Sequence, residues 1–225
     1  VAGSGKSLVL CSKARLLLEE HPDWKILITC YNVSLESVLK HYINSFFSSN
    51  GDNSNSSQYL YSDNILVLNF HSLCSKILKA ANAKWPDINE KEIRDKLAFK
   101  NLKVCEVEKI IENEKSNALG IKIQELLSSN SFDKFDAILV DESQDFHTSW
   151  LKCLTMLLNN SNFLLLAEDP NQKIYSRDFT YKEAGIDVVG RNKVHHLPIS
   201  YRSSKNIILT SSKLIVKSRW DEFYQ

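Results

Sequence analysis

Short runs of consecutive apolar residues alternate along the chain with longer segments whose apolar positions recur every three or four residues. The apolar runs predict buried β-strands at Lys25–Cys30, Asn64–Asn69, Asp136–Val140 and Asn162–Ala167. Strands with few polar interruptions are typical of a parallel sheet that is covered on both faces. The helical spacing predicts helices at Leu8–Glu20, which Pro22 ends, and at Ser34–Phe47 and Thr148–Asn159. This alternation predicts an α/β fold with a parallel central sheet flanked by helices.

Two stretches interrupt the alternation. Ser48–Gln58 contains no apolar residue and is typical of a solvated loop. Asn89–Ser128 is highly charged and helical in pattern, with no strand. We therefore expect residues 1–75 and 136–202 to form one α/β domain, and residues 76–135 to form a small helical insertion within it. Packing of the same helices directly onto the main core is the alternative.

Composition limits the classes of function that the chain can serve. Hydrophobic residues make up 43% of the 225 residues, which is enough for a sizeable core, and the formal net charge is only +1. A site for nucleic acid must therefore be a local groove and not a whole basic face. With no signal peptide and no apolar run long enough to span a bilayer, we expect a soluble cytoplasmic protein without a membrane partner. The cysteines show no C-x-x-C spacing and indicate buried thiols: Cys11, Cys30, Cys74, Cys105 and Cys153.

The first seven residues, VAGSGKS, match a nucleotide-binding phosphate loop that lacks its first glycine. That glycine would stand one position before Val1, so we expect the chain to be a fragment. Glycines allow the loop backbone to adopt positive φ, and its N–H groups then surround phosphate at the start of a helix. Lys6 would reach the β- and γ-phosphates of ATP, and the Ser7 hydroxyl would bind Mg²⁺. The predicted ATP-binding residues are Ala2, Gly3, Ser4, Gly5, Lys6 and Ser7; a simple Gly/Ser turn before a helix is the alternative.

A second candidate site follows the strand that ends at Val140. The chain continues there as Asp141-Glu142-Ser143-Gln144-Asp145, and ligands of open α/β sheets bind beyond the carboxyl ends of the strands. Asp141 would hold Mg²⁺ opposite Ser7, and Glu142 would act as the catalytic base that polarises the attacking water. The alternative is a strand that ends in two solvated carboxylates.

The sequence D-E-S-Q-D resembles the D-E-x-Q-D motif of superfamily 1 helicases of the UvrD/Rep type. Further resemblances to motifs of that family follow in the family's order. They are Thr29–Asn32 (TCYN, motif Ia), Asn69–Cys74 (NFHSLC, motif Ib), Glu168–Tyr175 (EDPNQKIY, motif III) and Leu197–Ser203 (LPISYRS, motif IV). The resemblance implies a RecA-like P-loop NTPase domain with an insertion of the 1B type in reduced form. It also implies that residues 203–225 begin a second RecA-like domain.

The resemblance implies roles for further residues, with ATP and Mg²⁺ as cofactors and single-stranded DNA, or DNA with a single-stranded tail, as partner. Gln172 would sense the γ-phosphate and Arg202 would be an arginine finger, although a lone arginine is usually a surface residue. The implied DNA contacts are Thr29, Tyr31, Asn32, Phe70, His71 and Tyr175. Core packing is the alternative for Phe70, and helix capping is the alternative for Asn32.

The chain departs from the family pattern in two places. The tryptophan that follows Ile-Tyr in motif III is absent, because Ser176 and Arg177 stand there, and motif IV has Ser200 where asparagine is usual. The implied function is an ATP-dependent helicase or translocase that moves along single-stranded DNA, 3′ to 5′ by family analogy. We expect the isolated chain to bind ATP weakly and to hydrolyse it slowly or not at all. An ATP-binding switch or defence-associated module without unwinding activity is one alternative, and a P-loop kinase or GTPase is another.

Overall fold

A parallel sheet in the strand order β2-β1-β3-β4 forms the centre of the structure. The computed structural model describes residues 3–48, 64–100, 102–169, 181–188 and 193–202. Its strands are β1 (Ile26–Cys30), β2 (Ile65–Asn69), β3 (Phe135–Val140) and β4 (Leu158–Leu166). The predicted α/β fold is confirmed, and each predicted strand is present.

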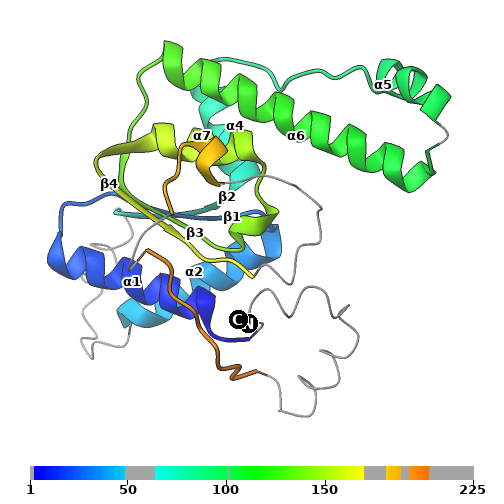
Figure 1. Ribbon diagram of the computed structural model, residues 1–225. Coiled ribbons are helices and arrows are strands. Elements are labelled where there is room, and N and C mark those ends of the chain that lie inside the picture. The colour runs from blue at the N-terminus through cyan, green and yellow to red at the C-terminus, as the bar shows by residue number, and fades with distance from the viewer. Residues whose placement is uncertain (1–2, 49–63, 101, 170–180, 189–192, 203–225) are drawn as a thin grey trace.

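Helices cover both faces of this sheet (Figure 1). Helices α1 (Lys6–Glu20) and α2 (Val33–Ser48) lie on one face, and α4 (Phe70–Ala80) and α7 (Thr148–Leu157) lie on the other. Successive strand residues point alternately to the two cores: Ile26 and Ile28 pack with α1 and α2, whereas Leu27 packs with α4 and α7. Burial of each such side chain contributes about 1.5–3 kcal/mol, which explains why the strands contain so few polar residues.

The boundary between α7 and β4 differs from the prediction. The helix predicted to reach Asn159 ends at Leu157, and β4 begins at Leu158 and not at Asn162. Leu158 pairs with Phe135 across the sheet, and the Asn159 side chain donates to the Asp136 carboxylate. Because of these contacts to β3, the last residues of the predicted helix belong to the sheet. The local spacing of apolar residues does not reveal contacts with a distant strand.

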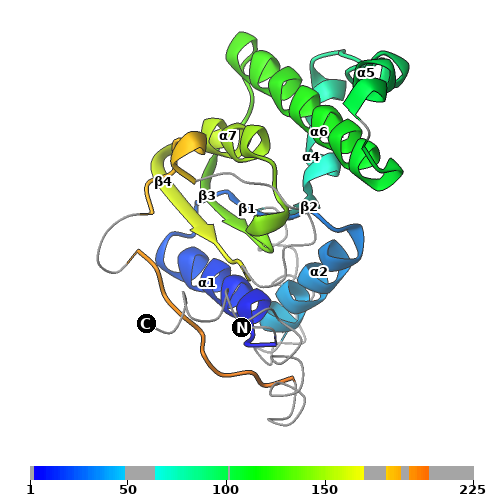
Figure 2. The same ribbon diagram turned by 45° about the vertical axis from the view of Figure 1, so that its right-hand side comes forward.

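The segment between β2 and β3 is helical, as predicted. It contains α5 (Glu90–Leu97), a 3₁₀ turn η1 (Ala98–Lys100) and the long helix α6 (Val104–Ser129). Figure 2 shows α5 and the adjoining start of α6 extending away from the sheet. Two ion pairs, Arg94–Glu108 at 2.9 Å and Lys115–Glu90 at 2.6 Å, join α5 to α6.

The second half of α6 packs against α7 on the main core. Gly120 makes this close approach possible, since a Cβ atom at that position would lie 2.4 Å from the Cβ atom of Ser149. The indole Nε1 of Trp150 donates to the carbonyl oxygen of Ser116 at 2.6 Å. The outer part of the segment thus extends from the core while the inner part joins it. Since α4 also crosses residue 75, the division at residues 75 and 136 stays a prediction.

Several other predictions concern the surroundings of these elements. Four of the cysteines, Cys11, Cys30, Cys74 and Cys153, are buried as predicted, whereas Cys105 is exposed. Burial raises the pKa of Cys11 and Cys30 to about 12, and the nearby Asp141 adds to both shifts. None of the helices in the described part of the chain is both long enough and apolar enough to cross a membrane. Most of the predicted loop Ser48–Gln58 and all of residues 203–225 lie outside the described residues.

Candidate functional site

The loop at the start of α1 has the backbone shape that a phosphate site needs. Gly3 and Gly5 have φ angles of +70° and +84°, and Gly5 is the residue from which α1 begins at Lys6. The first turn of α1 carries no acidic residue, and Gly5 makes no side-chain cap, so no side chain of the first turn itself would compete with an anion for the positive end of the helix. Ser4 is buried, and its hydroxyl has no hydrogen-bond partner among the described residues. Ala2 lies outside the described residues.

Asp141, at the carboxyl end of β3, is completely buried. Its Oδ1 accepts a hydrogen bond from the Glu142 backbone N–H at 3.1 Å, whereas Oδ2 has no hydrogen-bond partner within the described ranges. Burial raises the pKa of Asp141; the Ser7 hydroxyl opposes that shift and the Glu142 carboxylate reinforces it. A buried carboxylate with an unsatisfied oxygen beside a serine hydroxyl fits the requirements of a Mg²⁺ ion, which takes a few protein oxygens together with substrate phosphates.

Glu142 stands in an unusual backbone conformation. Its φ and ψ angles are 50° and 49°, in the left-handed region that costs a residue other than glycine about 1–2 kcal/mol. The Gln144 side chain, in the 3₁₀ turn η2 (Ser143–Asp145), donates from Nε2 to Glu142 Oε2 at 2.6 Å. The Gln144 Oε1 atom accepts from the Asp169 backbone N–H at 3.0 Å. The turn therefore holds the Glu142 carboxylate in place by a buried amide that also contacts the end of β4.

Lys6 forms an ion pair with Asp169, the residue that sequence analysis did not place in the site. The ammonium Nζ lies 3.2 Å from Asp169 Oδ2, and the two side chains are only 13% and 1% exposed. The pair joins residues 163 positions apart in the chain. The resemblance at residues 168–175 could have pointed to Asp169, because that segment follows β4 at the same edge of the sheet as the loop before α1.

Residues 193–202 bring the predicted arginine to the phosphate loop, as the orange segment beside α1 in Figure 1 shows. The Tyr201 backbone N–H donates to the Gly3 carbonyl oxygen at 2.9 Å. A Cβ atom at Gly3 would lie 2.6 Å from the Cβ atom of Arg202 and 3.0 Å from the Ser200 hydroxyl, so the contact requires glycine. The structure places Arg202 beside the loop, and its catalytic role stays a prediction. Gln172, which the sequence also nominated, lies outside the described residues.

Tyr181 is a second residue that sequence analysis missed. Its hydroxyl donates to the Glu168 carboxylate and lies 3.0 Å from the Ser143 hydroxyl, so the short turn η4 (Tyr181–Ala184) is tied to the residue that follows Glu142. Burial raises the pKa of the Tyr181 phenol, and the adjacent Glu168 carboxylate reinforces the shift. No local pattern in the sequence points to this contact, since Tyr181 lies outside the motifs.

The predicted DNA contacts divide into surface residues and buried residues. Tyr31 and His71 are partly exposed next to one another, with ring centroids 5.8 Å apart. Thr29 and Phe70 are completely buried, and Phe70 stacks on Trp150 at 4.7 Å. For these two side chains the prediction of a DNA contact is corrected: the side chains belong to the core, as the alternative for Phe70 held.

Asn32 and Tyr175 complete the set of predicted DNA contacts. The Asn32 side-chain oxygen accepts from the Ser34 backbone N–H at 2.7 Å, which caps the start of α2 as the alternative for this residue proposed. Its amide nitrogen can still contact a phosphate. Tyr175 lies outside the described residues.

A buried carboxylate joins the two segments that carry Tyr31 and His71. Glu36 in α2 accepts hydrogen bonds at Oε2 from the Asn69 backbone N–H, at 2.8 Å, and from the Asn69 side chain. Its Oε1 accepts from Lys40. Asn69 in turn accepts from the Ser72 backbone N–H and caps α4. Although burial raises it, the hydrogen bonds from Lys40 and Asn69 together hold the pKa of Glu36 below its ordinary value.

Replacing Glu36 with Gln should destabilise the domain by about 1.5 kcal/mol, because hydrogen bonds to a charged acceptor become weaker ones. A carboxylate whose pKa is lowered on folding stabilises the fold above its unfolded pKa of about 4.3 and loses that contribution as the pH falls through the folded pKa. The difference between the wild type and Glu36→Gln should therefore be full at neutral pH and shrink below about pH 4.3. Urea unfolding at several pH values measures this difference in the free energy of unfolding.

Glu92→Gln, which changes an exposed Glu–Lys pair of the same spacing, is the control and should have no effect. An equal effect of both variants would contradict the assignment.

The described residues contain no group of three or more His, Cys, Asp or Glu side chains that could hold a metal ion. Ser7 and Asp141, the predicted pair, lie close to one another, and their role in holding Mg²⁺ together with phosphate oxygens stays a prediction. The carboxyl edge of the sheet thus brings together a loop suited to an anion, Lys6, a candidate cation site and the Glu142 carboxylate. Groups of these kinds could support phosphoryl transfer.

Comparison with known proteins gives two matches. A family model described as the UvrD/REP helicase N-terminal domain matches residues 1–131 and 124–188. The chain is also 33% identical over 95 residues to a protein of Mycoplasma capricolum subsp. capricolum named "Probable DNA helicase II homolog". That alignment covers 39% of this chain and 13% of the relative, so the chain corresponds to a small part of the relative's length.

Proposed function

Because the chain belongs to the UvrD/Rep helicase family through its N-terminal domain, we propose that the protein is an ATP-dependent DNA helicase or translocase that moves along single-stranded DNA. One observation supports this most directly: Lys6, Ser7 and Glu142 lie close enough to the buried Asp141 to influence its pKa, and Arg202 lies beside Gly3. In this proposal the domain covering residues 1–75 and 136–202 is the ATP-binding one, and residues 76–135 are an insertion of the 1B type.

The residues at the carboxyl edge of the sheet have separate roles in the proposed hydrolysis of ATP. The loop N–H groups and Lys6 bind the β- and γ-phosphates of ATP, and Ser7 and Asp141 hold Mg²⁺, which supplies neutralising charge to the phosphates. Glu142 orients the attacking water and accepts its proton, while Gln144 fixes the Glu142 carboxylate from one side. Arg202 and Gln172 stabilise the charge that develops on the γ-phosphate.

The DNA site lies at the neighbouring ends of β1 and β2. Tyr31 and His71 are partly exposed aromatic rings there, and Asn32 starts the next helix. Bases stack on such rings without strict dependence on sequence, which suits a protein that moves along a strand. Glu36 joins the two segments, so the rings keep a constant separation.

The test uses the full-length protein. ATP hydrolysis should rise when single-stranded DNA is added, and a duplex with a 3′ single-stranded tail should be separated more quickly than one with a 5′ tail. Hydrolysis that DNA does not stimulate would reject the proposal. Stimulated hydrolysis or tight ATP binding without strand separation would instead favour an ATP-binding switch or a translocase that does not unwind.

A further inference from the structure

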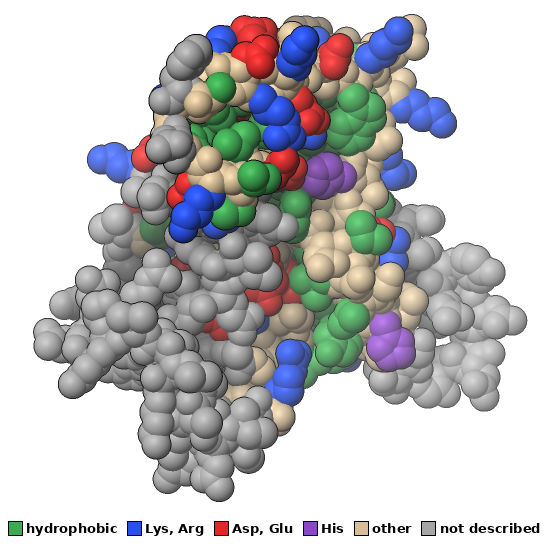
Figure 3. Space-filling model, turned by 90° about the vertical axis from the view of Figure 1, so that its right-hand side faces the viewer, with side chains coloured by type: hydrophobic (Ala, Val, Ile, Leu, Met, Phe, Trp, Pro, Cys, Tyr) green, Lys and Arg blue, Asp and Glu red, His purple; other side chains and the backbone are tan. Residues whose placement is uncertain are grey.

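A groove with a volume of about 410 Å³ lies between α4, the segment that follows it, and α6. It borders the proposed DNA contacts, because His71 forms part of its wall. Figure 3 shows a face of the molecule on which histidine, hydrophobic, acidic and basic side chains lie close together. The lining residues used below are His71, Trp85, Asp87, Glu90, Glu112 and Lys115.

Two aromatic rings form the groove wall nearest the proposed strand path. The rings of His71 and Trp85 are nearly parallel, with an angle of 18° and centroids 6.4 Å apart. Trp85 is 47% exposed, so much of its indole ring is accessible to a flat ligand that could stack on it.

The aromatic wall is supported from inside the protein. His71 packs edge-on against the buried Trp150 at 5.2 Å, and Tyr31 stacks on the same indole at 5.7 Å. A surface ring that is fixed from behind loses little conformational freedom when a ligand stacks on it, which favours binding. The row Tyr31, His71, Trp85 therefore extends from the end of β1 into the groove.

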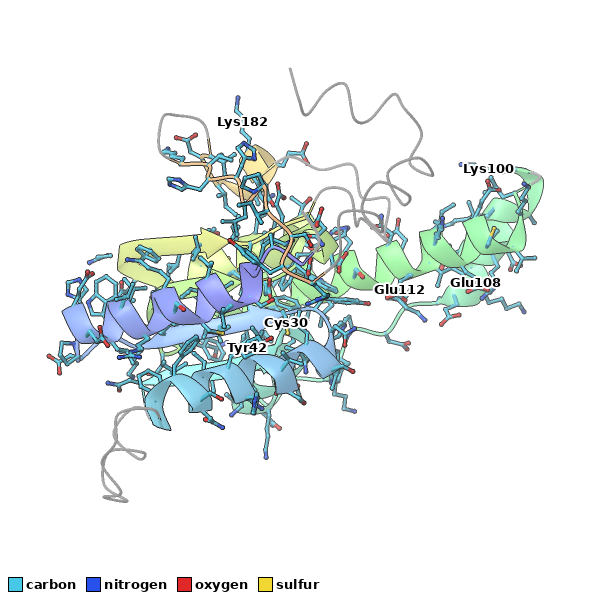
Figure 4. All side chains as sticks on the ribbon, turned by 90° about the horizontal axis from the view of Figure 1, so that it is seen from below. Cys30, Tyr42, Lys100, Glu108, Glu112 and Lys182 are labelled. Atoms are coloured by element: carbon cyan, nitrogen blue, oxygen red, sulfur yellow. The ribbon has the colours of Figure 1, made fainter. Side chains whose placement is uncertain are left out.

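Another part of the groove wall is acidic. Glu90 pairs with Lys115 at 2.6 Å, and Asp87 and Glu112 add two further carboxylates. Figure 4 shows Glu112 nearer to the sheet than Glu108 and Lys100, which lie farther out on the helical segment that extends from the sheet. Carboxylates repel phosphates but accept hydrogen bonds from the exocyclic amino groups of cytosine, adenine and guanine, which thymine lacks.

We infer that this groove takes one nucleobase from the translocating strand, which stacks on Trp85 and His71 and presents an amino group to the acidic wall. The inference rests on the proposed function and names a part of its DNA site. The groove continues the row of rings that begins at the proposed DNA contacts Tyr31 and His71. This continuity favours a nucleobase over a protein segment as the occupant.

Binding of labelled oligo(dA), oligo(dC) and oligo(dT) to the full-length protein tests the inference by fluorescence anisotropy. Trp85→Ala should weaken binding by about 5- to 150-fold, the range expected when stacking of one base is lost. Trp85→Phe, which keeps a ring, should lose much less. Trp24→Ala is the matched control, because Trp24 also stacks on a histidine, His21 at 4.0 Å, but lies beside the amino end of β1. It should bind as the wild type does.

Base preference separates a binding role from a structural one. The wild type should bind oligo(dC) and oligo(dA) more tightly than oligo(dT), and Glu112→Gln should bring these affinities closer together, since an amide offers both a donor and an acceptor. If the wild type binds single strands but neither Trp85 variant changes affinity, the inference is overturned. If the wild type binds no DNA at all, the proposed function itself fails.

Discussion

Glu142→Gln should lower the rate of DNA-stimulated ATP hydrolysis by the full-length protein about 100- to 10,000-fold, while ATP binding stays close to that of the wild type. An amide cannot accept the proton of the attacking water. Its shape matches that of the carboxylate, and its oxygen can still accept the hydrogen bond from Gln144. The left-handed backbone at residue 142 is equally available to glutamate and glutamine, so the turn should keep its conformation.

Two measurements check this expectation. Steady-state hydrolysis reports the rate, and displacement of a fluorescent ATP analogue at equilibrium reports binding. Glu20→Gln, at the exposed end of α1, makes the same chemical change away from the site and should leave both quantities unchanged. Wild-type turnover by Glu142→Gln would remove Glu142 from its role as base. Loss of ATP binding as well would mean that the residue shapes the site and does not serve only the chemical step.

Trp150→Ala should destabilise the domain by about 3–5 kcal/mol, the usual effect of removing a large buried aromatic side chain. Trp150 is completely buried in the centre of an aromatic cluster. It stacks on Phe70 at 4.7 Å, packs against Phe146, and donates to Ser116 in α6. Its loss leaves a cavity between the sheet and α6 that the neighbouring rings cannot fill without leaving their own contacts.

Thermal unfolding measures this effect, with an expected fall in Tm of about 6–20 °C for a chain of this size. Trp150→Phe keeps most of the stacking but removes the indole N–H, and it should cost only about 1–2 kcal/mol. Trp85→Ala, at a tryptophan that is 47% exposed, should change Tm far less than Trp150→Ala. A Tm for Trp150→Ala near that of the wild type would contradict the central position given to this residue. Because Trp150 supports Tyr31 and His71 from behind, its variants should also weaken DNA binding.

The elements of the fold could be predicted because each rests on residues close together in the chain. Nearly continuous apolar runs such as Ile26–Cys30 identify strands that both cores surround, and Gly5 followed by Lys6 identifies the start of α1. The error at Leu158 arose where local spacing and pairing with Phe135 disagree, and the sheet contact prevailed.

The residues proposed to bind nucleotide could be nominated from the sequence for the same reason. Gly3–Ser7 and Asp141–Glu142 are short stretches whose residue types suit phosphate and cation on their own. The DNA side was less predictable, because an aromatic residue such as Phe70 fits a core as well as it fits a base. Only its stacking on Trp150, 80 positions away in the numbering, identifies it as a core residue.

The sequence by itself thus determined the class of fold and located the glycine-containing turn before α1 and the carboxylates that follow β3, since local spacing and residue types suffice for these. The tertiary structure decided which side chains meet: Lys6 with Asp169, Glu36 with Asn69, and Tyr181 with Glu168. It also decided that Trp85 stands beside His71 at the edge of a groove. The physical reason is that burial, ion pairing and stacking depend on the partner that the fold brings close, and those partners lie far apart along the chain.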